Sequence, residues 1–339
     1  MHVLDTMLDN IQLTPLAAES LGVRSMCTYV QTPDVGILVD AGVSLCPDRF
    51  GLPPHPEEFR AIDICRRKIA EAAGKARVVT VSHYHFDHHT PSFEDWFCNW
   101  TSGSETAKQI YEGKIVLAKN PRTKINYSQR RRGWMFQKTG GRYAKKIEIA
   151  DGRTFIFRRS TEVRFSRPVF HGTEDSGLGW VLMVTIECQG EKIMFASDVQ
   201  GPMCSLTRDL ILGEKPHVLM IGGPPLYLSG FKVKEEQIQK GVKNLEELVE
   251  AVPVTILEHH ILRNRNWREN VENVFRRAEK FGHRVITAAE SIGKRDRLLE
   301  AFRRQLFHEK PAPQSFTRWT QKPREGRRRS RPPIFFDDS

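Results

Sequence analysis

The stretch from His83 to His89 reads His-Tyr-His-Phe-Asp-His-His and holds four of the 12 histidines in the chain. His83 and His85 are two residues apart, so in an extended chain both side chains point to the same side. Asp87 and His88 follow where we expect the chain to turn, and there they can face the same cavity from another direction. Imidazole nitrogen with carboxylate oxygen suits Zn²⁺, with Fe or Mn as competitors. This stretch therefore predicts a metal-binding loop.

The elements before this loop are predicted from the pattern of apolar residues. Residues 77–82 form a short β-branched run, which predicts a buried strand that delivers the histidines. Apolar residues three and four apart predict a helix from Glu57 to Ala73. Val23 to Gln31 and Val35 to Asp40 flank a Thr-Pro-Asp turn, which predicts a hairpin. A hairpin that ends at Asp40, a helix and a further strand thus lead to the loop.

Three later strands also end in residues that bind metals. Residues 168–170 lead into His171, residues 193–196 lead into Ser197-Asp198, and a strand from Val254 to Glu258 leads into His259-His260. The strand 216–221 leads into the Gly-Gly-Pro-Pro loop at 222–225. Helices at 234–252, 266–281 and 290–307 alternate with strands in this half of the chain.

The spacing His-x-His-x-Asp-His at 83–88 resembles the signature of the metallo-β-lactamase superfamily. Residues 82–91, the Gly-Gly-Pro-Pro loop and Glu258-His-His-Ile-Leu-Arg263 together are most similar to an uncharacterised archaeal family of predicted metal-dependent hydrolases. The resemblance implies an α/β (α+β) fold, the four-layer αβ/βα sandwich of the metallo-β-lactamase type. It covers residues 1 to about 305, and it leaves the basic stretch at 113–147 and the tail as additions.

The resemblance also implies a ligand set for two divalent ions, with zinc favoured. His83, His85 and His171 are implied for the first ion, Asp87, His88 and His259 for the second, and Asp198 for both. His260 is the alternative to His259, because adjacent residues point to opposite sides.

Further residues are implied to support these ligands or the substrate. Asp40 is expected to orient a ligand histidine, although a simple turn aspartate is the alternative. His89 lies outside the signature and is expected to support the ligands. Arg263 stands where transfer-RNA-processing nucleases carry an arginine, and the resemblance implies a phosphate contact.

The net charge of +11 is concentrated in two segments. Residues 113–147 hold 11 Lys and Arg without an acid, and residues 318–332 hold seven against one glutamate, so the remainder of the chain is net negative. Arg130, Arg131, Arg132 and Trp134 lie in the first segment, where cations and aromatic rings suit a flexible RNA or DNA. A packed insert with a basic outer face is an equal alternative.

Length and composition limit the possible domain organisation and location of the protein. The chain of 339 residues is long enough for a large core, and we expect a metallo-β-lactamase-like domain at 1–308 and a basic, disordered tail at 309–339. No apolar run approaches the length of a membrane span, and the six cysteines form no Cys-x-x-Cys pair. The amino terminus carries acids where a secretory signal has basic residues, which favours a cytoplasmic protein.

The sequence leaves three functions open. We favour a phosphodiesterase or nuclease in which a hydroxide bridges two metal ions and Asp87 or Asp198 passes a proton to the leaving group. The second is a hydrolase of a small phosphodiester, lactone or thioester. The third is a non-catalytic protein that binds a metal and nucleic acid. The seven implied ligands exceed what one closed metal site uses, which counts against the third.

Overall fold

The computed structural model describes residues 8–174 and 177–334, and two sheets packed face to face form its centre. The first sheet has six strands, of which β3, β4, β7 and β8 run parallel. Their order across the sheet is β1 (Gln12–Ala18), β2 (Met26–Gln31), β3 (Gly36–Val39), β4 (Val78–Val81), β7 (Ile115–Ala118) and β8 (Lys146–Ile149).

The second sheet has seven strands, of which β14 to β17 run parallel. Their order is β17 (Arg284–Ile286), β16 (Val254–Glu258), β15 (Val218–Gly222), β14 (Glu191–Ala196), β13 (Val184–Cys188), β10 (Thr161–Phe165) and β9 (Thr154–Phe157). Two small hairpins lie outside the main sheets: β5 (Glu94–Asp95) with β6 (Thr101–Ser102), and β11 (Val169–Phe170) with β12 (Trp180–Val181).

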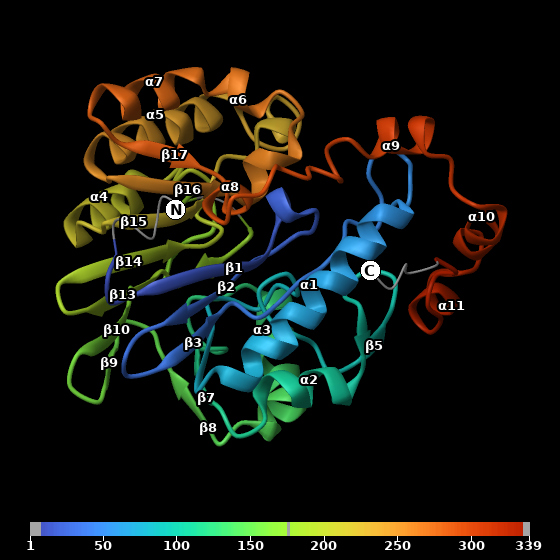
Figure 1. Cartoon of the computed structure of the whole chain (residues 1–339), viewed down its shortest axis with the longest axis horizontal. Helices are drawn as coiled ribbons and strands as arrows, with labels where there is room; N and C mark the ends of the chain where they lie inside the picture. Colours follow the sequence, from blue (N-terminus) through green and yellow to red (C-terminus); the bar gives the residue numbers. More distant parts are fainter. Residues whose placement is uncertain (1–7, 175–176, 335–339) are drawn as a thin grey trace.

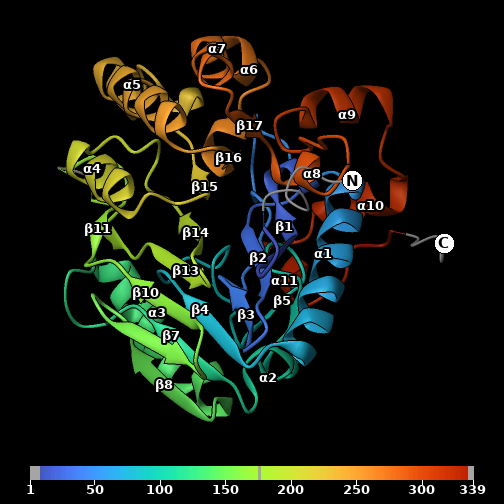
Figure 2. The same ribbon diagram turned by 60° about the vertical axis from the view of Figure 1, so that its left-hand side comes forward.

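Helices cover the outer face of each sheet, as Figures 1 and 2 show. The first sheet is covered by α1 (Pro56–Lys75), α2 (Ser104–Tyr111) and α3 (Tyr127–Lys138). The second is covered by α4 (Ser205–Glu214), α5 (Glu235–Ala251) and α7 (Glu272–Lys280). Shorter helices follow in the second half: α6 (Trp267–Asn270), α8 (Ala288–Ser291), α9 (Arg303–Glu309), α10 (Gln314–Thr320) and α11 (Arg324–Arg328).

The apolar core has three parts, one between each pair of adjacent layers. The central part joins the inner faces of the sheets, with Met26 and Ile37 on one side and Phe195 and Met220 on the other. The outer parts join each sheet to its helices. The central strands are buried on both faces, so each sheet needs a cover on both sides. The structure confirms the predicted four-layer αβ/βα sandwich.

Most elements lie where the sequence predicts them. The predicted hairpin, the strand before the histidine loop, the helix that precedes it and the strand Val254–Glu258 are all present. The helix predicted at 290–307 is wrong, since α8 ends at Ser291, Gly293 has a φ of +68° and helix resumes only at Arg303. Tertiary contacts hold residues 292–302 between these helices, and one of them is an ion pair of 2.6 Å between Arg24 and Glu300.

The basic stretch at 113–147 is not an addition to the fold. It contains β7, α3 and the first two residues of β8, and β7 and β8 are paired strands of the first sheet. Between β7 and β8 the chain leaves the sheet to form α3, whose Phe136 is buried. The stretch is therefore part of the sandwich, with cations on its exposed side.

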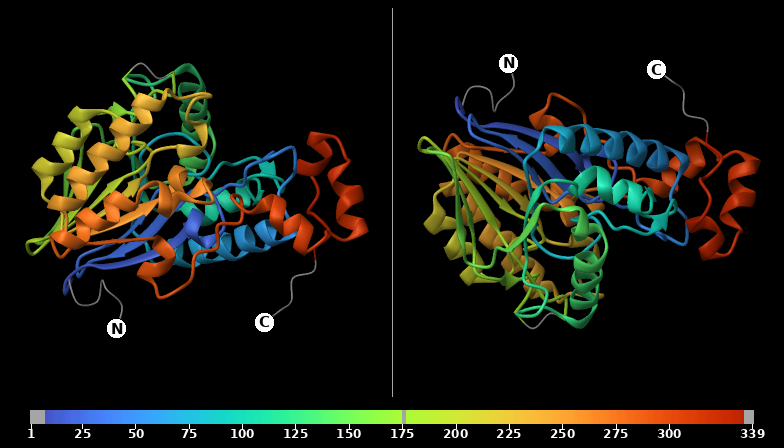
Figure 3. Two further views of the ribbon diagram at one scale, coloured as in Figure 1. Left: turned by 90° about the horizontal axis from the view of Figure 1, so that it is seen from above. Right: turned by 90° about the horizontal axis from the view of Figure 1, so that it is seen from below.

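The tail also differs from the expectation, because residues 309–334 are folded. Phe316 and Trp319 on α10 are buried, and each packs against Phe59 on α1. Figure 3 shows these last helices gathered at one end of the molecule. A tail rich in Pro and Arg thus gains order from two aromatic anchors. The parts of the predicted domain and tail at 1–7, 175–176 and 335–339 lie outside the described residues.

Candidate metal centre

The carboxyl ends of the parallel strands of both sheets meet at one edge, and the predicted donor residues lie there. His83 and His85 follow β4, and Asp198 follows β14. His171 follows the small strand β11, and His259 follows β16. Parallel strands place their carboxyl ends on the same side of a sheet, which is why residues far apart in sequence converge.

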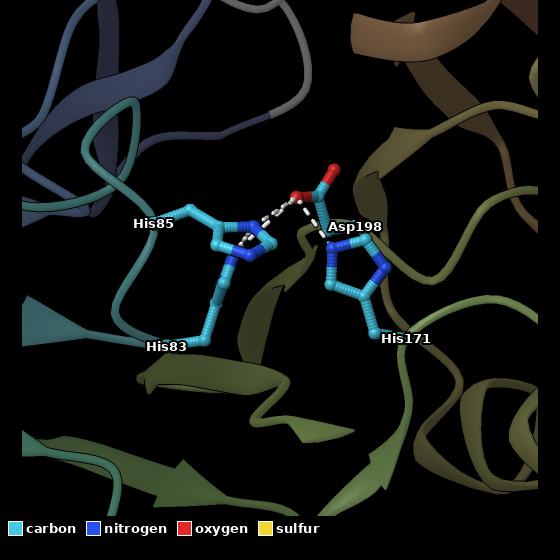
Figure 4. A group of neighbouring side chains, drawn as sticks. All are labelled: His83, His85, His171 and Asp198. Atoms are coloured by element: carbon cyan, nitrogen blue, oxygen red, sulfur yellow. Dashed lines mark hydrogen bonds and ion pairs between the residues drawn. The ribbon is translucent and has the colours of Figure 1, made fainter. Parts of the chain in front are cut away.

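The first donor group consists of His83, His85, His171 and Asp198 (Figure 4). Oδ2 of Asp198 lies 3.2 Å from Nε2 of His83, 3.1 Å from Nε2 of His171 and 3.9 Å from Nδ1 of His85. Nε2 of His83 lies 3.1 Å from Nδ1 of His85. Three imidazoles therefore face one carboxylate.

The second donor group consists of Asp87, His88 and His259, and its two histidines contact the same carboxylate. Nε2 of His259 is 2.8 Å from Oδ1 of Asp198 and 3.7 Å from Oδ2 of Asp87. Nε2 of His88 lies 3.3 Å from Oδ2 of Asp198 and 3.4 Å from Nε2 of His259. His260 also reaches this group, with Nε2 at 3.3 Å from Oδ1 of Asp198. Asp198 stands between the two groups.

The donor set fits divalent metal ions. Nitrogen and oxygen ligands about 2.0–2.2 Å from a tetrahedral zinc ion lie about 3.3–3.6 Å from one another, close to the separations measured between these atoms. A mixed imidazole and carboxylate set is also what zinc, iron and manganese accept. The residues present therefore fit divalent metal ions, and Asp198 contacts histidines of both donor groups.

Hydrogen bonds hold three of these imidazoles with Nε2 toward Asp198. Nδ1 of His88 donates to Oδ2 of Asp40 at 3.0 Å, and Nδ1 of His83 lies 3.0 Å from the Ser82 hydroxyl, which itself donates to Asp40. Nδ1 of His259 donates to Oε2 of Glu19 at 2.9 Å. A proton on Nδ1 leaves the lone pair of Nε2 free for a metal, so these hydrogen bonds fix the tautomer that a ligand histidine needs.

The backbone at Gly42 packs directly against the backbone of the loop that carries the histidines. A Cβ on Gly42 would lie 2.3 Å from the backbone nitrogen of His89 and 2.4 Å from that of His88. Only glycine fits at this position. His89 itself turns away from the donors, and its Nδ1 donates to the carbonyl of His85 at 2.9 Å.

Burial and charge divide the donor histidines into two protonation classes. Burial lowers the pKa of His83 and of His85, which keeps both neutral. Burial also acts to lower the pKa of His259, but the carboxylates of Asp198 and Glu19 outweigh it and raise this pKa to about 9. Burial acts to raise the pKa of Asp198, but the surrounding histidines hold it well below its usual range. Metal loading is therefore expected to displace protons.

Arg263 does not face the open side of the centre. Its side chain is 3% exposed, its Nη2 lies 2.6 Å from Oε1 of Glu19, and its Nη1 donates to Nδ1 of His260 at 2.9 Å. The structure thus places this arginine behind His259 and His260, where it holds Glu19 and His260 in place. Arg263 also belongs to the lining of a groove beside His260, so the expected phosphate contact stays a prediction.

Comparison with known proteins gives a family. No family model matches the chain. It is 42% identical over 301 residues to a UPF0282 protein of Methanopyrus kandleri, covering 88% of this chain and 100% of the relative. A UPF0282 protein of Methanocaldococcus jannaschii is 42% identical over 297 residues, covering 87% and 96%. The chain belongs to the UPF0282 family. This agrees with the resemblance to an uncharacterised archaeal family.

Three solved structures are similar to this UPF0282 chain over most of its length. A metal-dependent hydrolase of the beta-lactamase superfamily, Tm1679, is 14% identical with a TM-score of 0.45, covering 82% of this chain and 96% of the other. Zn²⁺-bound PqqB from Methylobacterium extorquens is 11% identical with a TM-score of 0.42, covering 81% and 97%. The short form of human tRNase Z is 10% identical with a TM-score of 0.41, covering 74% and 92%.

Sequence reasoning missed two residues of the UPF0282 centre. Glu19 directly follows β1, and a carboxylate at a strand end was a signal that could have found it. Tyr227 lies 3.3 Å from Nδ1 of His260 through its hydroxyl, and no pattern in the sequence marks it. Both come from segments distant from the histidine loop, so only the fold brings them to it.

Proposed function

We propose that this UPF0282 protein is a metal-dependent hydrolase that holds two divalent ions and cleaves phosphodiester bonds in RNA or DNA. The observation that carries the proposal is the convergence of seven donors, of which Asp198 contacts histidines of both groups. The proposed ligands are His83, His85 and His171 for one ion, Asp87, His88 and His259 for the other, and Asp198 for both, with zinc favoured over manganese or iron.

One side of the centre is open to a substrate. The side chains of His85 and Asp87 are 24% and 17% exposed, whereas those of His83, His88 and His259 are fully buried. Bound divalent ions would supply Lewis acidity and lower the pKa of water from about 15.7 to about 7. Asp87 is the more exposed of the two central carboxylates, so we assign it the transfer of a proton to the leaving group.

A groove next to His260 favours an anionic substrate. It encloses about 600 Å³, and Arg49, Arg265 and Tyr227 line it without a carboxylate. The guanidinium carbon of Arg49 lies 4.4 Å above the ring of Tyr227, whose hydroxyl reaches His260. Guanidinium groups bind phosphate oxygens through paired hydrogen bonds, so this groove suits the backbone of a nucleic acid.

The test is a cleavage assay with the zinc-loaded chain on single-stranded RNA, single-stranded DNA, a small phosphodiester and a lactone. We expect cleavage of a nucleic acid, and we expect Asp198→Asn or His171→Ala to lower its rate at least about a hundredfold. His308→Ala changes an exposed histidine on α9 and serves as the control.

Two outcomes would replace this proposal. Cleavage of the lactone or small phosphodiester alone would favour a hydrolase of small substrates. Binding of nucleic acid and metal without turnover of any substrate would favour a non-catalytic binding protein.

A further inference from the structure

A separate cavity lies between α3 and the loop that carries the metal ligands. It encloses about 520 Å³, within the range of about 300–1,000 Å³ that ligand pockets occupy. Phe86 and Phe93 line it from the loop side, and Tyr127, Met135, Arg131 and Arg132 line it from α3. Aromatic and apolar surface thus meets two cations in one hollow.

The cavity and the metal centre lie on opposite sides of one loop. His85, Asp87 and His88 turn toward the donors, whereas Phe86 and His89 turn toward the cavity. The ring of His89 packs edge-on against Phe136. A group bound in the cavity therefore rests on residues adjacent in sequence to the metal ligands.

Only positive charge faces this cavity. Its lining contains Arg131 and Arg132 but no Asp or Glu. Within the residues that the structure describes, neither Arg131 nor Arg132 forms an ion pair with a carboxylate. The guanidinium carbon of Arg132 lies 4.7 Å above the ring of Phe86, which orients this cation over an aromatic surface.

The charge continues along α3 beyond the cavity. Arg130 and Lys138 are exposed on the same helix but do not line the hollow. Tyr127 is 81% exposed at the rim. One phosphate would not need cations outside the cavity, so the extended row favours a ligand with several phosphates along a chain.

We propose that this cavity binds one nucleobase of a single-stranded nucleic acid, with the base against Phe86 and Tyr127 and an adjacent phosphate on Arg131 and Arg132. Stacking on aromatic rings accepts any base, and the arginines neutralise the backbone. The inference rests on the proposed function, because the strand bound in the cavity would be the nucleic acid that the metal centre cleaves.

The test compares two strands of equal length and charge. The zinc-loaded full chain is titrated with a fluorescent oligothymidylate carrying phosphorothioate linkages and with the matching abasic strand, and anisotropy reports binding. We expect at least about tenfold tighter binding of the strand with bases. Equal affinity for the two strands would overturn the proposal.

Matched variants locate the base. Tyr127→Ala is expected to reduce the preference for bases severalfold, whereas Trp134→Ala, which removes an exposed aromatic ring of α3 outside the cavity, is expected to leave it unchanged. The opposite pattern would contradict the proposed location. Circular dichroism of each variant checks that the fold is retained.

Charge variants locate the phosphate. Arg131→Gln or Arg132→Gln is expected to weaken binding of both strands at least about threefold more than Arg130→Gln. An equal effect of all three would contradict a phosphate site in the cavity.

Two further comparisons identify the source of the ligand and distinguish failure of this inference from failure of the proposed function. Binding of thymidine monophosphate as tight as binding of the strand would show a free nucleotide as the ligand and would overturn the proposed strand. Base preference without any cleavage would refute the proposed function and leave this inference standing, and cleavage without base preference would do the reverse.

Discussion

At the scale of single residues, the centre depends on how each imidazole is held. His-x-His-x-Asp-His could be recognised in the sequence because its residues are adjacent, and the strand before it fixes their directions. The partners of the ligands could not be recognised as readily. Glu19 contacts His259 across 240 positions of sequence, and Tyr227 reaches His260 from a loop after β15. Such pairs exist only after the two sheets have packed.

A substitution at Asp40 tests this support. Asp40→Asn keeps an oxygen that can accept from the Ser82 backbone nitrogen, but it removes the charge that fixes His88. We expect zinc affinity to fall about 10–100-fold with the fold retained. Competition against a chromophoric chelator measures the affinity. Asp34→Asn, in the turn before β3, is the control, and a loss of affinity as large there would contradict a specific role for Asp40.

At the scale of elements, strands were more predictable than the segments between them. Their apolar runs mark the sheets because both faces are buried. The prediction of a helix at 290–307 is wrong because tertiary contacts outweigh helical periodicity there. The composition of the tail predicts disorder because it does not reveal the two aromatic anchors on α10. The sequence leaves His259 and His260 as alternatives, because adjacent residues point to opposite sides. In the structure His259 has a φ of +65° in a short 3-10 helix, and both rings reach Asp198.

The contact between the end of β3 and the metal loop is tested by Gly42→Ala. The added Cβ would press on backbone atoms of His88 and His89, which cannot move without shifting the loop. We expect at least about tenfold weaker zinc binding, because ligand geometry tolerates little displacement. Gly74→Ala, where the Cβ would meet open space in α1, is the matched control. Unchanged zinc affinity in the Gly42 variant would contradict this prediction and show that the loop can shift without loss of ligand geometry.

The packing of the tail is tested by Trp319→Ala. The indole packs against Phe59 and Phe97, and its Nε1 donates to Ser330 Oγ at 3.0 Å. We expect the free energy of unfolding to fall by about 3–5 kcal/mol, measured by chemical denaturation. Arg318→Ala on the exposed side of α10 is the control. A disordered tail would give the same stability for both variants.

At the scale of the whole molecule, the metal centre joins the two sheets. The loop after β4 belongs to the first sheet, and Asp198 and His259 belong to the second. Divalent ions held between them would bind the folded state more tightly than the unfolded chain, so we expect metal loading to stabilise the sandwich as a whole. No helix among residues 8–174 and 177–334 is both long and apolar enough to cross a membrane.

The central claim is that donors from both sheets hold two ions around Asp198. Elemental analysis of the zinc-loaded, dialysed chain tests it, combined with anomalous diffraction from its crystals. We predict about two zinc ions per chain, one in each donor group, and loss of bound zinc in Asp198→Asn but not in Asp209→Asn on the surface of α4. A chain without bound zinc, or zinc content that Asp198→Asn leaves unchanged, would contradict the claim.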